Sequence, residues 1–349
     1  MASYRIFGDS IISEAEIRSG KVDFSCDPLD DPGNPLSTDG DIKGFTPIGK
    51  GKPLTVMIRE VYTGRYPKKG ILGGSKDVAV LSSVKNYDIF SASSRALNFI
   101  MRKAGRRDRK AGPSAYENGS ALVCYSPAIL TDSQIVSIQF AVDDFPGEFL
   151  DTVSGAFDKL GQIPLLLPHS GYLMAASGLI KIASGLGNSI FDDRAEFSFD
   201  LSIDFDIPGS EIAKADFRLL ADDSLRMEDY TYDPQRGLID RSTDKAYDGD
   251  EPYVILSLDG KKREALEAFK PTVASAEILH RFMDMKSGSD VTIDTIVAGV
   301  SLLSDMKYRE RAEDVQRRIA DTDDPDIASA LESELDAIIA NIRSDVLRP

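Results

Sequence analysis

The sequence is poor in the residue types that carry most side-chain chemistry at neutral pH. Its 349 residues include two cysteines, two histidines and no tryptophan. Cys26 and Cys124 are too few for a disulfide framework, and neither belongs to a CxxC pair or a Cys/His cluster with zinc-ligand spacing. This scarcity excludes a disulfide scaffold and a contiguous zinc site, and it indicates two buried free thiols in a reducing compartment.

Motifs for nucleotide or nucleophilic chemistry are also missing. Residues 44–51 have the spacing of a phosphate loop, but glycine stands where a hydroxyl must bind Mg²⁺, and a strand follows where a helix is required. No serine has GxSxG surroundings. We therefore expect no catalytic and no cofactor-binding residues, and no enzyme. The alternative is a hydrolase with a non-contiguous site that uses Cys124 or His169.

Composition favours a globular chain with more than one region. Hydrophobic residues make up 42% and charged residues 28%, which is typical of folded proteins. Residues 1–10 lack the basic, apolar and small-residue succession of a secretory signal, so we expect a cytoplasmic protein. Turn residues near position 30 indicate a loop, and together with the predicted strands and helices they suggest three regions. These are N-terminal strands and a loop (1–50), a β-rich domain (51–262) and a helical C-terminal region (263–349).

The clearest strand covers residues 197–207, where apolar and polar side chains alternate. This pattern places one face on a core and the other in water, as in antiparallel sheets. Further strands are predicted at 54–58, 78–84, 121–125, 135–142, 215–220 and 253–258.

Helices are predicted near the end of the chain, at 271–285 and 292–320. A third begins after the Asp324–Pro325 cap and carries an apolar stripe of Leu331, Leu335, Ile338 and Ile342. The expected class is α+β, an antiparallel β-sandwich-like domain interrupted by one apolar, glycine-rich helix and followed by a helical C-terminal region.

The glycine-rich helix is predicted over residues 170–191. Gly171, Gly178 and Gly185 recur every seven residues, and Lys181 is the one charge over most of this length. Small residues along a helix face allow close packing. Two interpretations follow: a central packing helix, or a latent membrane segment in which the lysine costs roughly 3 kcal/mol.

Charge is segregated along the chain, although the net charge is −16. Residues 43–110 carry 16 Lys/Arg and 4 Asp/Glu, a balance of +12, whereas residues 192–259 carry 7 and 19, a balance of −12. The two blocks either neutralise each other within the fold, or the basic block binds an anionic partner.

The basic block is densest in one run, which is the candidate partner- or anion-binding surface: Arg102, Lys103, Arg106, Arg107, Arg109 and Lys110. Such a cluster suits an acidic protein, an anionic membrane or nucleic acid, although aromatic side chains for base stacking are missing nearby. An exposed loop of this composition is also a target for trypsin-like proteases. The simplest alternative is a solvated loop that forms salt bridges with the acidic block.

Asp200, Asp204 and Asp206 lie on the polar face of the 197–207 strand and are candidate Ca²⁺ ligands. In this respect the sequence resembles C2-type sandwiches, a resemblance that implies a calcium- or anionic-lipid-binding module. The alternative is a solvated acidic sheet face.

These observations favour a non-enzymatic binding or effector protein that acts through a protein partner. In its sharper form the protein is latent, and cleavage or partner binding releases the glycine-rich helix towards a membrane. No cofactor is expected, apart from Ca²⁺ under the C2-type alternative.

Overall fold

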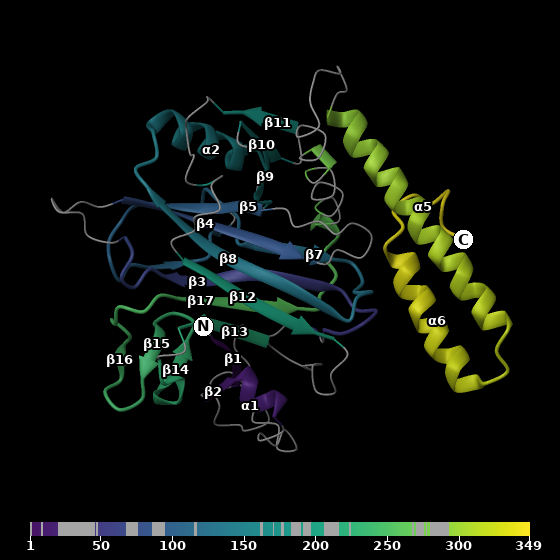
Figure 1. The fold of residues 1–349 in the computed structure, drawn as a ribbon, viewed down its shortest axis with the longest axis horizontal. Coiled ribbons are helices and arrows are strands. Elements are labelled where there is room, and N and C mark those ends of the chain that lie inside the picture. The colour runs from purple at the N-terminus through teal and green to yellow at the C-terminus, as the bar shows by residue number, and fades with distance from the viewer. Residues whose placement is uncertain are drawn as a thin grey trace.

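The computed structural model of the chain describes residues 2–7, 10–19, 46, 48–67, 76–85, 95–114, 117–160, 163–169, 171–175, 178–182, 190, 197–205, 216–222, 225–266, 269, 276, 278–279 and 293–349. Within these residues the strands form two seven-stranded antiparallel sheets and a smaller three-stranded sheet, and helices lie outside the sheets (Figure 1). The predicted α+β class with antiparallel, sandwich-like sheets is confirmed.

The first sheet has the order β2-β1-β13-β17-β3-β6, and β7 also pairs with β3. Its strands are β1 (Ala2–Phe7), β2 (Ser10–Ser13), β3 (Leu54–Tyr62), β6 (Arg109–Ala111), β7 (Leu122–Ser126), β13 (Asp216–Ala221) and β17 (Tyr253–Asp259). The short helix α1 (Glu14–Arg18) follows β2 and begins at a capping box on Ser13. Because β1 pairs with β13, the N-terminal strands extend a sheet whose other strands come much later.

The second sheet has the order β11-β10-β9-β5-β4-β8-β12. Its strands are β4 (Lys76–Lys85), β5 (Arg95–Ala104), β8 (Ser133–Asp143), β9 (Leu165–His169), β10 (Tyr172–Ala175), β11 (Gly178–Lys181) and β12 (Phe197–Asp204). The small sheet consists of β14 (Tyr230–Asp233), β15 (Gly237–Asp240) and β16 (Lys245–Ala246). Two short 3-10 helices are η2 (Met227–Asp229) and η3 (Glu264–Leu266).

The main core lies between the two large sheets. Strand β12 shows how the sequence builds it, since Phe199 and Leu201 are buried while Asp200 and Ser202 are exposed. Their apolar neighbours include Ile58 of β3 in the other sheet. The alternation predicted for this strand is confirmed over its described residues.

The outer face of the second sheet is covered by helix α2 (Gly147–Leu160), which the sequence analysis did not predict (Figure 1). Phe149, Val153 and Phe157 of α2 belong to one buried cluster with Leu81 and Leu97 of the sheet. The second sheet is therefore buried on both faces at its centre.

The prediction of a helix over residues 170–191 is wrong. Strands β10 and β11 pair as an antiparallel hairpin in this segment. Leu173 packs in the cluster under α2, whereas Met174 packs in the core between the sheets. With both faces buried the segment shows no apolar–polar alternation, and such a run is not distinguished from a helix by its pattern.

The glycines that suggested a helix therefore have other roles. Gly171 lies in the turn before β10, Gly178 begins β11 and Lys181 ends it with an exposed side chain, while Gly185 lies outside the described residues. Because this segment is not a helix, the interpretation that it is a latent membrane helix is wrong as well. Among the described helices, none is long and apolar enough to cross a bilayer.

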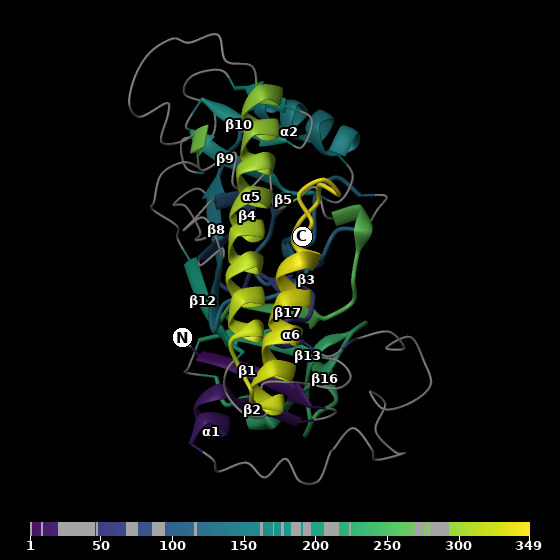
Figure 2. The same cartoon turned by 90° about the vertical axis from the view of Figure 1, so that its right-hand side faces the viewer.

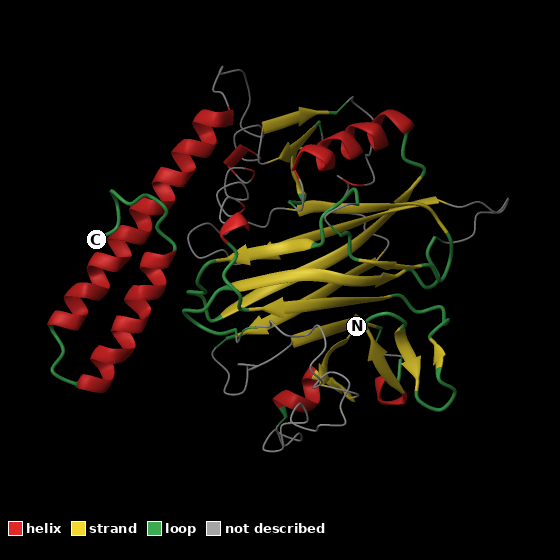
Figure 3. Ribbon diagram, turned by 180° about the vertical axis from the view of Figure 1, so that it is seen from behind, coloured by secondary structure: helices red, strands yellow, loops and turns green. Residues whose placement is uncertain are grey.

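Two helices end the chain, α5 (Ile293–Ala320) and α6 (Pro325–Ala340), and run side by side along one edge of the sandwich (Figures 2 and 3). Asp324 caps α6 by accepting the backbone N–H groups of Asp326 and Ile327, as predicted. The predicted stripe is confirmed, because Leu331, Leu335, Ile338 and Ile342 all pack in the cluster between the helices. The helix predicted at 271–285 lies almost entirely outside the described residues, and the boundaries at 50 and 262 stay predictions.

Candidate functional site

The candidate basic run is not an open loop but a tight crossing between the two large sheets. Arg102 and Lys103 lie near the end of β5 in the second sheet, residues 105–108 form a turn, and Arg109 and Lys110 begin β6 in the first sheet. We call residues 102–110 the basic turn.

The basic turn begins with a β-bulge. Val78 pairs with Met101 and Lys76 with Ala104, so two residues of β5 stand opposite the single residue Asp77 of β4. Asp77 is buried, and its carboxylate accepts the backbone N–H of Lys103 at 2.7 Å. Lys103 takes a φ of 50°, a left-handed conformation that disfavours a side chain.

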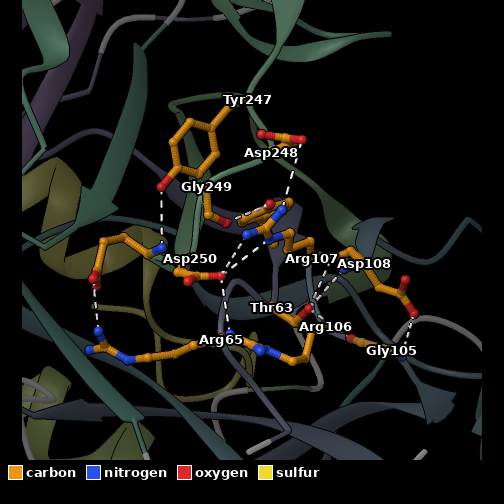
Figure 4. Close-up of polar contacts among 12 residues, drawn as sticks. Thr63, Arg65, Gly105, Arg106, Arg107, Asp108, Tyr247, Asp248, Gly249 and Asp250 are labelled. Atoms are coloured by element: carbon orange, nitrogen blue, oxygen red, sulfur yellow. Dashed lines mark hydrogen bonds and ion pairs between the residues drawn. The ribbon is translucent and has the colours of Figure 1, made fainter.

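Hydrogen bonds close the turn (Figure 4). The Asp108 carboxylate accepts the N–H of Gly105 at 2.6 Å. The fully buried Thr63 hydroxyl donates to the Gly105 carbonyl at 3.1 Å and accepts the Asp108 N–H at 2.9 Å. The Arg107 N–H donates to the carbonyl of Gly64 at 2.8 Å, and Arg107 has a φ of 65°. These bonds hold the backbone in one conformation, which argues against rapid cleavage of the folded protein here.

Ion pairs join the turn to the acidic block of residues 192–259. This agrees with the interpretation that the basic and acidic blocks neutralise each other within the fold. Arg106 and Arg107 both donate to Asp250 at 3.1 Å, and Arg107 lies 3.9 Å from Asp248 (Figure 4). The hydrogen bond to Asp250 raises the pKa of Arg107. Beside them Arg65 pairs with Glu251 at 2.7 Å. Because the Asp250 side chain is 51% exposed, its pairs lie in high-dielectric surroundings and hold the arginines weakly.

The two cations of β6 also have partners. Arg109 lies 3.8 Å from the buried carboxylate of Glu60 and donates to the Gln235 carbonyl at 2.7 Å. Burial raises the pKa of Glu60, against the opposing effects of its hydrogen bond from Tyr253 and of Arg109. Lys110 donates to Glu117 at 2.7 Å, and this hydrogen bond together with one from the Ser114 N–H lowers the pKa of Glu117 to about 2.

The remaining cations, Arg102 and Lys103, have exposed side chains. Within the part of the chain that the structure describes, no carboxylate pairs with either of them. Arg102 and Lys103 are therefore the cations of the basic turn that can bind another molecule without first breaking an ion pair.

The other candidate residues do not form a site. Asp200 and Asp204 lie four residues apart on one strand, about 13 Å at the rise of a strand, which is too far for both to bind one Ca²⁺. Asp206 lies outside the described residues, among which no group of three metal-binding side chains occurs. Cys124 is buried, and burial raises its pKa to about 12, so the thiol stays protonated at neutral pH. Neither Cys26 nor the side chain of His169 is among the described parts.

The residues that shape the turn, notably Thr63, Asp77 and Asp250, were not predicted from the sequence. They come from segments up to 144 residues away along the chain, and no local motif marks them. One signal was available: Asp108 is the single acid inside the basic run, where a carboxylate suits a turn.

Comparisons of the chain with models of protein families, with curated proteins and with solved structures find no match.

Proposed function

We propose that this protein is a non-enzymatic binding protein that acts through an acidic protein partner, and that the basic turn is its contact surface. The observation that supports the proposal is the left-handed backbone conformation of two basic residues in the turn. Among the described residues three non-glycine residues have positive φ, and two of them are Lys103 and Arg107.

A left-handed conformation costs a residue with a side chain roughly 1–2 kcal/mol relative to glycine. Glycine is the residue that relieves this cost, yet the turn has a lysine and an arginine at these positions. Strained residues of this kind concentrate at functional sites, where the side chain has a use that outweighs its conformational cost. In this turn, the use that exposed cations support is the binding of an anionic group.

The turn also presents its cations in a fixed arrangement. Its backbone is held by Thr63, Asp77 and Asp108, so little conformational entropy is lost when a partner binds. Arg102 and Lys103 can pair with a carboxylate of the partner without first breaking an ion pair. Arg106 and Arg107 can exchange the exposed carboxylate of Asp250 for a carboxylate of the partner.

Mixed charge favours a protein over a polyanion. The carboxylates of Asp108, Asp248 and Asp250 lie among the arginines and repel a continuous phosphate backbone or an anionic bilayer. A protein surface, on which single carboxylates are separated by neutral groups, fits such an arrangement better.

The proposal is tested with the double variant Arg102→Glu/Lys103→Glu. Its matched control, Lys85→Glu/Lys181→Glu, changes the net charge equally at two exposed strand-end lysines that have no partner among the described residues. Tagged wild type and both variants are used for affinity purification from nuclease-treated extract, followed by quantitative mass spectrometry.

We expect at least one acidic protein to be recovered with wild type and with the control, and to be lost with Arg102→Glu/Lys103→Glu. Purified partner and wild type then bind directly, more weakly as salt rises. If every recovered protein is equally abundant with both variants, the basic turn is not the contact surface. Binding of duplex DNA or of phosphatidylserine vesicles that only the turn variant loses would assign the surface to those ligands instead.

A further inference from the structure

A cavity of about 720 Å³ lies where the C-terminal helices meet the sandwich. Its walls come from α5, from the end of α6 and the tail that follows it, and from the loops after β7 and β17. Sites for small molecules commonly have volumes of about 300–1,000 Å³, so this cavity has the size of a ligand site. It lies apart from the basic turn: α5 and α6 are on the right of Figure 1, whereas the small sheet that contacts Arg109 is on the left.

One side of the cavity is apolar. Leu302 of α5 and Ile339 of α6 contribute exposed surface to it, whereas Ile342, which follows α6, is almost fully buried. Leu302 is 54% exposed, and Met306, one helical turn further on, is exposed to the same extent. Large apolar side chains with this exposure are a recognised feature of binding surfaces. The wall therefore suits the apolar part of a ligand.

Cations also line the cavity. Lys262 enters from the loop after β17, and Arg343 from the tail after α6. Both side chains are exposed, and among the described residues no carboxylate pairs with either. Arg348 also lines the cavity, but Asp345 pairs with it at 2.8 Å. Two cations from separate segments thus line the cavity, and within the described part of the chain neither has a carboxylate partner.

Buried polar groups hold this part of the cavity wall in place. Asp305 of α5 is 4% exposed, and its carboxylate accepts the backbone N–H groups of Arg343 at 3.2 Å and Ser344 at 2.9 Å. Asn341 is also buried and donates to the carbonyls of Ala128 at 3.2 Å and Ala337 at 2.9 Å. The Asp305 oxygens are engaged by the tail, and this bonding positions Arg343 beside the apolar wall.

We infer that this cavity binds an amphiphilic anion, a small molecule with an apolar body and a carboxylate or phosphate head. The apolar body lies against Leu302 and Ile339, and the head pairs with Lys262 and Arg343. Charge-assisted hydrogen bonds to two cations orient the ligand, while burial of the apolar body supplies most of the affinity. This site does not depend on the function proposed for the basic turn.

Titration calorimetry on the full chain tests the inference with laurate and dodecyl phosphate, each below the concentration at which it forms micelles. We expect one molecule of either anion to bind, and dodecyltrimethylammonium, which has the same tail with a cationic head, to bind far more weakly. Lys262→Glu/Arg343→Glu should weaken anion binding by about tenfold or more, and Leu302→Asp should weaken it as well. Lys85→Glu/Lys181→Glu, with the same change in net charge, should bind as wild type does.

Lys262, Arg343 and Leu302 are exposed, so these variants should fold, and their circular dichroism and melting curves establish that they do. Absence of binding by both anions overturns the inference. So does equal affinity for the cationic amphiphile, or unchanged affinity in Lys262→Glu/Arg343→Glu. Binding to phosphatidylglycerol vesicles without binding of either free amphiphile also overturns it, because the proposed occupant is a single molecule within the cavity.

Discussion

Replacing Lys103 with glycine should stabilise the folded protein while it removes a residue of the proposed contact surface. Relief of the left-handed conformation is worth about 1–2 kcal/mol, and the greater freedom of glycine in the unfolded chain costs about 0.5–1 kcal/mol. The net gain is about 0–1.5 kcal/mol, centred on about 0.75 kcal/mol. The hydrogen bond from the residue 103 N–H to Asp77 is unaffected, because glycine keeps this group.

Arg102→Gly is the matched control. It removes one exposed cation from the neighbouring residue, but Arg102 does not have a positive φ, so only the cost of glycine remains. Arg102→Gly should therefore destabilise the protein by about 0.5–1 kcal/mol. The difference between the two variants isolates the backbone strain at Lys103, about 1–2 kcal/mol.

Urea unfolding of both variants measures this difference. With a slope of about 3 kcal/mol per molar urea, the two midpoints should differ by about 0.3–0.7 M, with Lys103→Gly above wild type and Arg102→Gly below it. Midpoints that move together in the same direction would refute the assignment of strain to Lys103. Recovery of the protein partner should fall for Lys103→Gly despite its greater stability.

Three further predictions concern other parts of the fold. Burial raises the pKa of Glu60 above its ordinary 4.5, so the folded state holds this proton more tightly than the unfolded state. The stability of wild type relative to Glu60→Gln should therefore fall as pH rises above about 4.5. A difference in urea midpoints that does not change with pH would contradict this. In a Cys26→Ser background the Cys124 thiol, with its pKa raised to about 12, should react with Ellman's reagent only after denaturation, and fast reaction of the folded protein would show that it is accessible. Asp324→Ala removes the N-cap of α6 and should cost about 1 kcal/mol, seen as a lower melting temperature, whereas Asp324→Ser should retain most of the stability.

Local patterns predicted β12 and α6, which face water on one side, although α2, also exposed on one side, was not predicted. Strand β12 alternates because Phe199 lies in the core and Asp200 in solvent, and α6 was found from the Asp324 cap and an apolar stripe at helical spacing. The segment around β10 has no such contrast, because Leu173 and Met174 are buried on opposite faces. Its apolar, glycine-rich sequence therefore suggested a helix.

The candidate site was predictable only as a concentration of charge. The run of basic residues and the opposing acidic block follow directly from the order of residues along the chain. The ion pairs of Arg106 and Arg107 with Asp250 agree with the interpretation that the blocks neutralise each other in part. Which cations stay free depends on distances between segments that the sequence does not contain.

The sequence by itself determined the segregation of charge, the antiparallel class and the lack of contiguous catalytic motifs, since these depend on residue order and local periodicity. Only the tertiary structure decided that residues 172–175 and 178–181 are strands, because burial on both faces removes the periodic signal. It alone also placed Thr63 and Asp77 around the basic turn, and brought Lys262 and Arg343 to the same cavity. Such contacts join residues far apart in the chain, and packing of the whole fold sets them.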